Sequence, residues 1–591
     1  SQSPIDTNGH GTEVAGIIGA NGSFSGMAPS SQLFSYKVSS SGESVSSEAI
    51  IQSIDQAIKD KIDVINISLG VNRTNDGLDN AVDKAVANKI IVVTAAGNNG
   101  PDLETIGSPG KDINVITVGA SYNNITSSLV STLVIDKEQF QSIPMLGTVS
   151  VIGPVNGHVV YGGYGRVKDL QNVDAKGSIL LEERGSDVSG EKVYFTEKEK
   201  NAADSGARAL VVFNNQSGIF FGELKNPSDK SYTPRIPVIS ISKDDGIKIK
   251  SMIKNNTIAN LDIFYHPDYV APFSSRGPVS PFYIKPDLVA PGIFVNTTTL
   301  DGKYNITSGT SAAAPHVTGA IAMLLQKYPH LDPESVSSLI STTTDPVTDA
   351  YGKPLPISAT GSGRLNITRA FDANLIIIPH SLVFDLSHQN PSDSEILHLK
   401  SIDGKPISPL KVSFSSNESS LKFSYDIKNN NMNATVEDLE KKSGDFDGFI
   451  TIDDSKTDYR IPVVIHLTKG TLHASENDGK IKVSLDYPEK WSFAKITMTT
   501  PTSHYTRTTS ITPGNSESIP IYDTGVYWLE AEIESGNLTE HAYKIIEAKG
   551  PVSNSFDLEY LLKIPIKEIA IISAIMIAIV AVGIAVRKRR I

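Results

Sequence analysis

The sequence predicts an α/β protein with a doubly wound, mostly parallel sheet, followed by β-sandwich domains and one C-terminal transmembrane helix. Between residues 30 and 120, near-continuous apolar strands alternate with amphipathic helical segments, a pattern typical of a parallel sheet covered by helices on both faces. After residue 373 the pattern changes to short alternating strands separated by turn-rich segments, which is typical of β-sandwiches. The uncharged run Ile569–Val586 is long enough for a membrane-spanning helix.

Size and composition indicate a multidomain globular chain. At 591 residues it is too long for one hydrophobic core and fits about three to five domains. The 39% hydrophobic and 20% charged residues are typical of folded proteins. Because the chain has no cysteine, disulfides, thiolate metal sites and a cysteine nucleophile are excluded. The net charge of −12 comes without a basic stripe, so we expect no nucleic-acid partner.

The first 120 residues supply the elements of the predicted sheet. Helices are expected around Ile50–Ile58 and over Leu78–Ala87, where apolar residues recur on one face. Ligands of such sheets bind at the carboxyl ends of the strands, where Ser68-Leu69-Gly70 and Gly97-Asn98 fall. The expected strands are Gln32–Val38, Val64–Ser68, Ile90–Thr94 and Val115–Val118.

A helix with a serine at its entry is expected to start after Gly309. Val317, Ile321 and Leu324 follow at helical spacing, which predicts a buried helix entered from a tight turn. Ser311 then lies at the positive end of the helix dipole, and its own N–H is among the unpaired donors there. A nucleophile needs this arrangement, because nearby N–H groups stabilise a developing oxyanion. The alternative is an ordinary Ser or Thr cap on a core helix.

A second helix rich in small residues is expected to begin at His10, in the segment His10-Gly11-Thr12. A lone histidine at a helix start is more often structural, but its combination with Gly309-Thr310-Ser311 is a rarer coincidence. In these segments the sequence resembles the subtilisin family of serine peptidases, over roughly residues 1–120 and 270–372. The other matching segments, in the family's order, are Ser68-Leu69-Gly70, Ala95–Asn99, Phe273–Pro278, Ala290–Gly292 and Ala312–Pro315.

The resemblance implies a subtilisin-like serine endopeptidase that hydrolyses peptide bonds of proteins or peptides through an acyl-enzyme. Ser311 is the implied nucleophile, His10 the general base and Asn98 the side-chain oxyanion donor. Asn99 is the adjacent alternative to Asn98, but the alignment of Ala95-Ala-Gly-Asn98 favours Asn98.

A substrate edge is also implied by the resemblance. Ser68, Leu69 and Gly70 resemble the strand edge that pairs with an extended substrate backbone, which reads the main chain and leaves side-chain choice to pockets. Structural calcium is common in the family, but no carboxylate cluster of this sequence is specific enough to name ligands. No metal site and no cofactor are therefore assigned.

Two further residues near these motifs, His316 and Glu13, are not expected to take part in catalysis. Five helical steps separate His316 from Ser311 and turn about 500°, which places His316 about 140° round the helix. We therefore expect His316 to be structural. Glu13 stands where many relatives carry a second histidine, and it is assigned no catalytic role.

The acid partner of His10 has no candidate in the expected place. The family takes this acid from a β-strand well before the histidine motif, in an Asp-Thr/Ser-Gly setting. Asp6 is followed by Thr7-Asn8-Gly9, but His10 comes only four residues later, which is too close for a strand and its connection. We expect Asp6 to be a polar turn residue, the third triad member to be absent from this chain, and the chain to be an amino-terminal truncation.

The resemblance also divides the chain into expected domains. The two parts of the subtilisin-like catalytic domain are expected at 1–120 and 271–372. The segment 121–270 resembles an inserted protease-associated (PA) domain, expected to influence substrate choice, with a passive spacer as the alternative. Its matching residues are Lys198, Asn201, Ala202 and Gly206. The remaining expected parts are β-sandwich domains at 373–470 and 471–550, a linker at 551–568, a transmembrane helix at 569–586 and a basic tail at 587–591.

The location follows from the apolar run near the carboxyl end. Basic residues directly after Ile569–Val586 favour the cytoplasmic side of a membrane. We expect a single-pass cell-membrane protein with the catalytic domain outside and the tail in the cytoplasm, which makes the membrane a partner through this helix. The alternative function is a catalytically inactive cell-surface binding or adhesion protein on the same scaffold.

Overall fold

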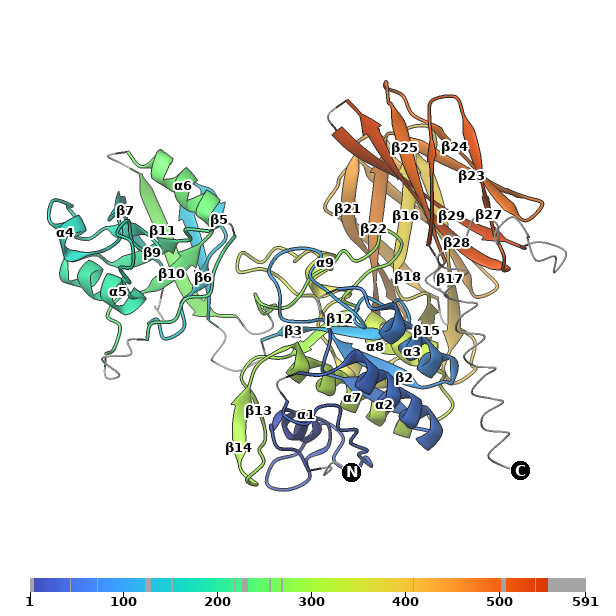
Figure 1. Ribbon diagram of the computed structural model, residues 1–591, viewed down its shortest axis with the longest axis horizontal. Helices are drawn as coiled ribbons and strands as arrows, with labels where there is room; N and C mark the ends of the chain where they lie inside the picture. Colours follow the sequence, from blue (N-terminus) through green and yellow to red (C-terminus); the bar gives the residue numbers. More distant parts are fainter. Residues whose placement is uncertain are drawn as a thin grey trace, which may run out of the picture. The chain divides into compact units, whose positions relative to one another are not determined.

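The computed structural model describes residues 5–42, 44–71, 73–122, 129–149, 153–216, 218–225, 232–254, 257–266, 269–407, 409–500, 506–536 and 538–550. The chain forms two compact units, one up to Thr471 and one from Leu472 onward. All helices of the described residues belong to the first unit, and the second unit is built of strands (Figure 1).

A four-stranded parallel sheet, with strands between Val64 and Pro291, lies in the first unit. Its order is β1-β2-β3-β12, and all three neighbouring pairs are parallel. Alternate residues of β2 face opposite layers, because Ile91 and Val93 share a core with one helix layer and Val92 with the other. The strands are Val64–Ile67, Ile91–Ala95, Ile116–Ser121 and Leu288–Pro291, and the helices are α7 (Thr310–Lys327) on one face and α2 (Ser47–Asp60) and α3 (Asp76–Ala87) on the other.

Small residues let helix α1 (His10–Gly19) lie close to its neighbours. It packs against α7 and against the hairpin of β13 (Val295–Thr298) and β14 (Tyr304–Thr307). A Cβ added at Gly16 would collide with Thr298, and one added at Gly319 of α7 would collide with Met27. Gly16 and Gly319 are therefore required by this close packing.

The expected strand Gln32–Val38 is not formed. The segment has no regular secondary structure, and no ladder pairs it with another strand. β1 is the edge of the parallel sheet on the side away from β2, and a strand needs a neighbour at hydrogen-bonding distance. Leu33 and Phe34 are 46% and 51% exposed, so the apolar residues that suggested a strand are not fully covered.

Between β3 and β12 the chain forms a different, eight-stranded sheet. Its order is β5-β4-β11-β7-β8-β9-β10-β6, with β7 to β10 parallel. Helices α5 and α6 both pack against β9. The elements are β4 (Leu129–Ile135), β5 (Glu138–Phe140), β6 (Ile143–Pro144), β7 (Val155–Tyr161), α4 (Val167–Leu170), β8 (Ile179–Glu183), α5 (Phe195–Asp204), β9 (Ala209–Phe213), β10 (Val238–Ile241), α6 (Lys243–Met252) and β11 (Ile258–Tyr265).

Strands dominate the remainder of both units. In the first unit, the sheets β15-β17-β20-β19 and β16-β22-β21-β18 contribute apolar residues to one shared core. In the second, the sheets are β23-β24-β27 and β26-β25-β28-β29. The elements are α8 (Pro333–Thr342), α9 (Ile357–Thr360), α10 (Ile367–Asp372), β15 (Leu375–Ile378), β16 (Leu382–Ser387), β17 (Ser392–Ser401), β18 (Lys411–Ser416), β19 (Leu421–Lys428), β20 (Asn431–Asp438), β21 (Gly444–Asp453), β22 (Asp458–Thr468), β23 (Thr471–Asn477), β24 (Lys480–Asp486), β25 (Phe493–Thr499), β26 (Thr506–Ile511), β27 (Ser516–Pro520), β28 (Gly525–Ser535) and β29 (Leu538–Ala548).

The fold class and the location expected from the sequence need a correction. Among the described residues, no helix is both long and apolar enough to cross a membrane. The longest of them, α7, has 18 residues, but it carries Ser, Thr, His, Gln and Lys along its length. The segment expected to span the membrane, 569–586, lies outside the described residues. The transmembrane helix, the membrane partner and the single-pass location are therefore not supported.

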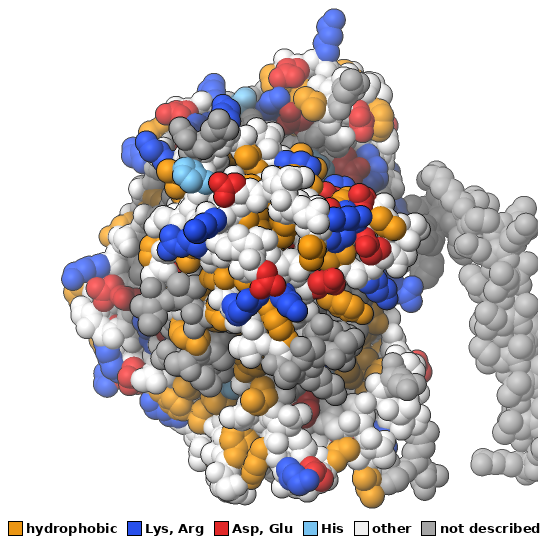
Figure 2. Space-filling model, turned by 90° about the vertical axis from the view of Figure 1, so that its left-hand side faces the viewer, with side chains coloured by type: hydrophobic (Ala, Val, Ile, Leu, Met, Phe, Trp, Pro, Cys, Tyr) orange, Lys and Arg blue, Asp and Glu red, His pale blue; other side chains and the backbone are white. Residues whose placement is uncertain are grey.

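Charged side chains of both signs are mixed on the face of the molecule drawn in Figure 2. Lys and Arg lie beside Asp and Glu, with apolar side chains scattered between them. Such mixing is typical of a solvated surface and produces no large field of one sign.

Candidate active site

A cleft of about 1720 Å³ brings together residues that are far apart in the sequence. It is lined by parts of α1, the segment 31–39, α2, β1, the loop after β2 and α7. All the residues singled out from the sequence for catalysis or substrate binding lie along it, namely His10, Ser68, Leu69, Gly70, Asn98 and Ser311. Asp6 also lines this cleft.

Ser311 is the second residue of α7 and follows a glycine that the local geometry requires. Gly309 has φ 154°, a value that residues with a side chain rarely adopt. A Cβ added at Gly309 would lie 3.0 Å from Ser311 Oγ and 3.5 Å from Asn98 Nδ2. These two polar atoms therefore border the same small space, which stays open because residue 309 has no side chain.

The carboxamide of Asn98 is held in one orientation by Thr310. Asn98 Oδ1 accepts hydrogen bonds from the Thr310 backbone N–H at 2.9 Å and from its hydroxyl at 3.0 Å. Thr310 Oγ1 in turn accepts from the Gly97 N–H at 3.1 Å. With both donors on the oxygen, the amide nitrogen of Asn98 faces the space beside Ser311. A preorganised N–H donor in this position can stabilise negative charge on an oxygen.

Asn99, the adjacent alternative, is placed differently. Its backbone N–H donates to Ser275 Oγ at 3.1 Å. The amide nitrogen nearest to the space beside Ser311 is that of Asn98. The geometry therefore favours Asn98 over Asn99 as the donor.

His10 opens α1, and its helix is capped by Asp6. Asp6 Oδ1 accepts from the N–H groups of Asn8 and Gly9, both at 2.9 Å. Asp6 Oδ2 accepts from the N–H and the hydroxyl of Thr12 at 2.8 and 2.7 Å. Partial burial works against the charged form of Asp6, but these hydrogen bonds outweigh it and lower its pKa to about 2. Both carboxylate oxygens are thus committed to the start of the helix.

The imidazole of His10 has no carboxylate partner within the part of the chain that the structure describes. The hydrogen bond recorded for His10 is made by its backbone N–H, to Asn8 Oδ1 at 3.3 Å, and no ion pair of the described residues includes its ring. A triad needs an acid on the second ring nitrogen, to fix the tautomer and to stabilise the imidazolium. Asp6 does not fill this position, in agreement with its expected role as a turn residue.

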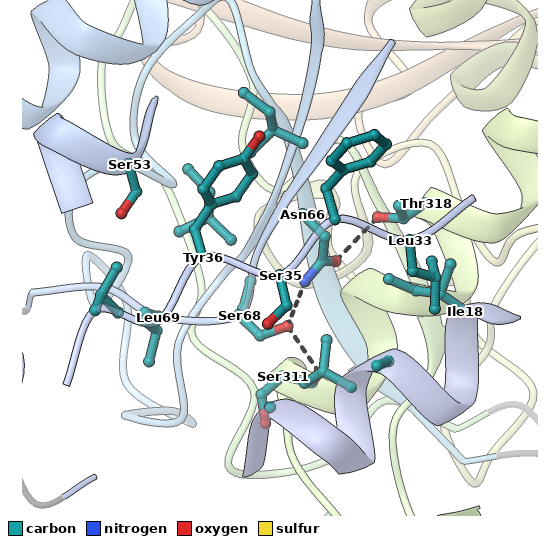
Figure 3. A pocket seen from close by; sticks show the side chains of 18 of the residues that line it. Ile18, Leu33, Ser35, Tyr36, Ser53, Asn66, Ser68, Leu69, Ser311 and Thr318 are labelled. Atoms are coloured by element: carbon teal, nitrogen blue, oxygen red, sulfur yellow. Dashed lines mark hydrogen bonds between the residues drawn. The ribbon is translucent and has the colours of Figure 1, made fainter. Parts of the chain in front are cut away.

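The side chain of Ser68 makes a contact that the sequence did not indicate. Its hydroxyl donates to the main-chain oxygen of Ser311 at 2.9 Å and accepts from Asn66 Nδ2 at 2.9 Å. The Thr318 hydroxyl donates to Asn66 Oδ1 at 2.9 Å, so these side chains form one connected network (Figure 3). Sequence reasoning missed Asn66 and Thr318. The available signal was a polar Asn66 within the otherwise apolar run Val64–Ile67.

His316 and Glu13 point to other partners. His316 Nδ1 lies 2.9 Å from the main-chain oxygen of Ala312 in its own helix, and burial lowers the pKa of His316, which keeps the ring neutral. Glu13 Oε2 accepts from the Thr307 hydroxyl at 3.0 Å. Neither residue lines the cleft that holds Ser311.

A serine at the entry of a buried helix, with an imidazole and an amide donor along the same cleft, is the arrangement of a serine hydrolase on a parallel α/β sheet. The sequence profile of the subtilase family matches residues 1–368. The chain therefore belongs to the subtilase family.

Individual relatives agree with this family. The chain is 33% identical over 385 residues to the minor extracellular protease Vpr of Bacillus subtilis, covering 63% of this chain and 46% of that protein. It is 28% identical over 434 residues to a PII-type proteinase of Lactococcus lactis, covering 62% of this chain and 22% of that protein. It is 30% identical over 456 residues to the subtilisin-like protease SBT3.9 of Arabidopsis thaliana, covering 69% of this chain and 56% of that protein. The chain thus spans between about a fifth and a half of these relatives' lengths.

Proposed function

We propose that this chain carries the catalytic machinery of a serine endopeptidase that cleaves proteins or peptides through an acyl-enzyme. Ser311 Oγ attacks the scissile carbonyl, and His10 accepts its proton and returns it to the leaving amine. The negative oxygen of the tetrahedral intermediate lies in the space beside Gly309. There the amide of Asn98 and the N–H of Ser311 donate to it. The acyl-enzyme is then hydrolysed by water in the same way.

The observation that carries this proposal is the fixed carboxamide of Asn98. An asparagine after a strand is usually a turn former, and as such it needs no particular amide orientation. Here two donors from Thr310 hold Oδ1 and leave Nδ2 beside Ser311 Oγ. A donor fixed before the reaction needs no reorganisation when charge develops, and such donors contribute strongly to catalysis.

The substrate is an extended polypeptide that lies along the edge formed by Ser68, Leu69 and Gly70. Backbone pairing at such an edge suits a peptidase, because it recognises any main chain in extended form. The side chain of Ser68 faces α7, so its contribution to substrate binding comes from the backbone. The names of the relatives, which are proteases and proteinases, support a polypeptide substrate.

Among the residues that the structure describes, no carboxylate pairs with the ring of His10, and the third triad member is not supplied by Asp6. The commitment of Asp6 to the α1 backbone supports this assignment. Loss of the acid alone lowers turnover by about 3 × 10⁴-fold in subtilisin. Without such an acid, hydrolysis by His10 and Ser311 is expected to be correspondingly slow, and a carboxylate at the second ring nitrogen of His10 would raise it.

The eight-stranded sheet between residues 129 and 265 belongs to a PA-type domain that influences which substrates reach the cleft. Its expected pattern residues make hydrogen bonds that hold neighbouring loops in place. Lys198 Nζ donates to the main-chain oxygens of Tyr164 and Glu183, and Asn201 Nδ2 donates to that of Gly165 at 2.8 Å. Deletion of 129–265 with a short linker is expected to change the ratio of cleavage rates between peptide substrates. An unchanged ratio favours the passive spacer.

The test of the proposed activity is covalent labelling with a fluorophosphonate. The folded chain is incubated with the reagent, and the modified residue is identified by peptide mass spectrometry. We expect slow, time-dependent incorporation at Ser311 that is absent from Ser311→Ala and strongly reduced in His10→Ala. No incorporation into correctly folded protein would instead support the catalytically inactive binding protein.

A further inference from the structure

Helix α7 contains a proline near its amino end, and this proline changes the hydrogen bonding of Ser311. Pro315 lies inside the helix and has no N–H. In a regular helix the N–H of residue 315 would donate to the main-chain oxygen of residue 311. That donor is missing, so the carbonyl of the residue that carries the nucleophile loses its usual partner within the helix.

Strand β1 supplies a substitute donor from outside the helix. The Ser68 hydroxyl, directly after β1, donates to the Ser311 oxygen at 2.9 Å. This bond ties the carboxyl end of β1 to the first turn of α7. The chain between the two residues is 243 positions long, so the contact exists only in the folded state.

The orientation of the Ser68 hydroxyl is set by a relay that returns to α7. Asn66 Nδ2 donates to Ser68 Oγ at 2.9 Å, so the Ser68 proton is directed toward Ser311. Asn66 Oδ1 accepts from the Thr318 hydroxyl at 2.9 Å, which fixes which end of the carboxamide faces Ser68. Thr318 is 5% exposed, and its hydroxyl also lies 3.1 Å from the Ala314 main-chain oxygen. The relay is drawn in Figure 3.

We propose that Asn66, Ser68 and Thr318 are positioning residues, which hold the backbone of Ser311 so that its Oγ and N–H face the oxyanion space. They act through the Ser311 carbonyl and need not touch substrate. The inference rests on the function proposed above. If the Ser311 carbonyl is released, the peptide plane at the start of α7 can rotate, and the geometry of attack is degraded. A misplacement of about 1 Å at a reacting group can lower a rate by about 10²-fold.

The competing explanation is that the relay only joins the edge strand β1 to α7 and contributes to stability. Loss of a buried hydrogen bond lowers the free energy of unfolding wherever it occurs. Thr342 offers a matched control, because it is a buried helical threonine whose hydroxyl donates to the Ser338 main-chain oxygen four residues earlier, at 2.7 Å. It lies in α8 and does not line the cleft.

The experiment measures fluorophosphonate labelling of Ser311 as a function of reagent concentration, which separates the maximal phosphonylation rate from the reagent's dissociation constant. We expect Thr318→Val to lower the maximal rate by about 10- to 100-fold at an unchanged dissociation constant. Thr318→Ser keeps the hydroxyl, so its maximal rate is expected to stay within about threefold of wild type, a smaller change than the roughly 10-fold loss expected of Thr318→Val. Thr342→Val is expected to lower the melting temperature without changing the maximal rate.

Ser68→Ala gives a second route if Thr318→Val does not fold, since Ser68 is only partly buried and its change removes the donor to Ser311 directly. We expect the same loss of maximal rate in Ser68→Ala, with recovery in Ser68→Thr. Unchanged maximal rates in Thr318→Val and Ser68→Ala would overturn the positioning role, as would an effect confined to the dissociation constant. Absence of labelling in the wild-type chain would contradict the proposed function instead.

Discussion

The nucleophile side and the base side of the candidate site differ in how many hydrogen bonds hold their functional groups. On the nucleophile side, Asn98 is fixed by Thr310, and the Ser311 carbonyl is held by Ser68. On the base side, His10 begins a helix beside an open cleft, and Asp6, the acidic residue that precedes it in the sequence, caps that helix. Electrostatic stabilisation by fixed donors does not depend on the base. Among the described residues, the proposed oxyanion donor is therefore held by more hydrogen bonds than the proposed base.

The largest effect that tests this comparison is expected from Asn98→Ala. It removes the fixed donor and leaves Ser311 and His10 in place, so turnover is expected to fall by about 10²- to 10³-fold with little change in KM. Steady-state hydrolysis of a chromogenic peptide by purified protein measures both constants. Asn99→Ala is the matched control and is expected to retain most of the activity. A change mainly in KM would show that Asn98 binds substrate and does not hold the oxyanion.

Ser311→Ala is expected to have a similar or smaller effect on hydrolysis. In subtilisin, loss of the serine costs about 2 × 10⁶ and loss of the acid about 3 × 10⁴, and the losses are not additive. A chain whose His10 lacks an acid should therefore lose only about 10²-fold further in Ser311→Ala. Active-site titration of each preparation guards against a contaminating peptidase. A drop approaching 10⁶-fold would show that a carboxylate does reach His10 and would contradict the difference between the two sides.

The smallest effect on activity is expected from Asp6→Asn. If Asp6 only caps α1, the change costs about 1 kcal/mol of stability and alters turnover by less than about threefold, far below the roughly 10⁴-fold loss on removing a triad acid. Urea unfolding and peptide hydrolysis are measured on the same preparation. A loss of turnover near 10⁴-fold would identify Asp6 as the acid.

The contribution of Asp6 to the stability of the fold is expected to fall as the pH is lowered. The folded-state pKa of Asp6 is about 2, below the ordinary value of 3.8. Its stabilising contribution is therefore present above the ordinary value and is lost as the pH falls from about 4 toward 2. The stability difference between wild type and Asp6→Asn should shrink over this range in urea unfolding. A difference that stays constant down to pH 2 would show that the charge of Asp6 does not stabilise α1.

Much of the site could be predicted from the sequence because it depends on local patterns. Apolar residues at helical spacing placed Ser311 at a helix entry, and near-continuous apolar strands indicated a parallel sheet with helices on both faces. The spacing of Asp6 and His10 was enough to favour a cap over a triad acid, and the geometry agrees. In each case, the information lies within one turn or one strand.

The tertiary structure decided the features that depend on partners far away in the sequence. Gln32–Val38 has the composition of a strand, but a strand also needs a neighbour, and β1 does not pair with it. The Ser68 hydroxyl could serve a substrate, a turn or a helix, and only the folded chain brings it to Ser311. Periodicity determines which face of an element is apolar, whereas the partner of a polar group is set by the element that packs against it.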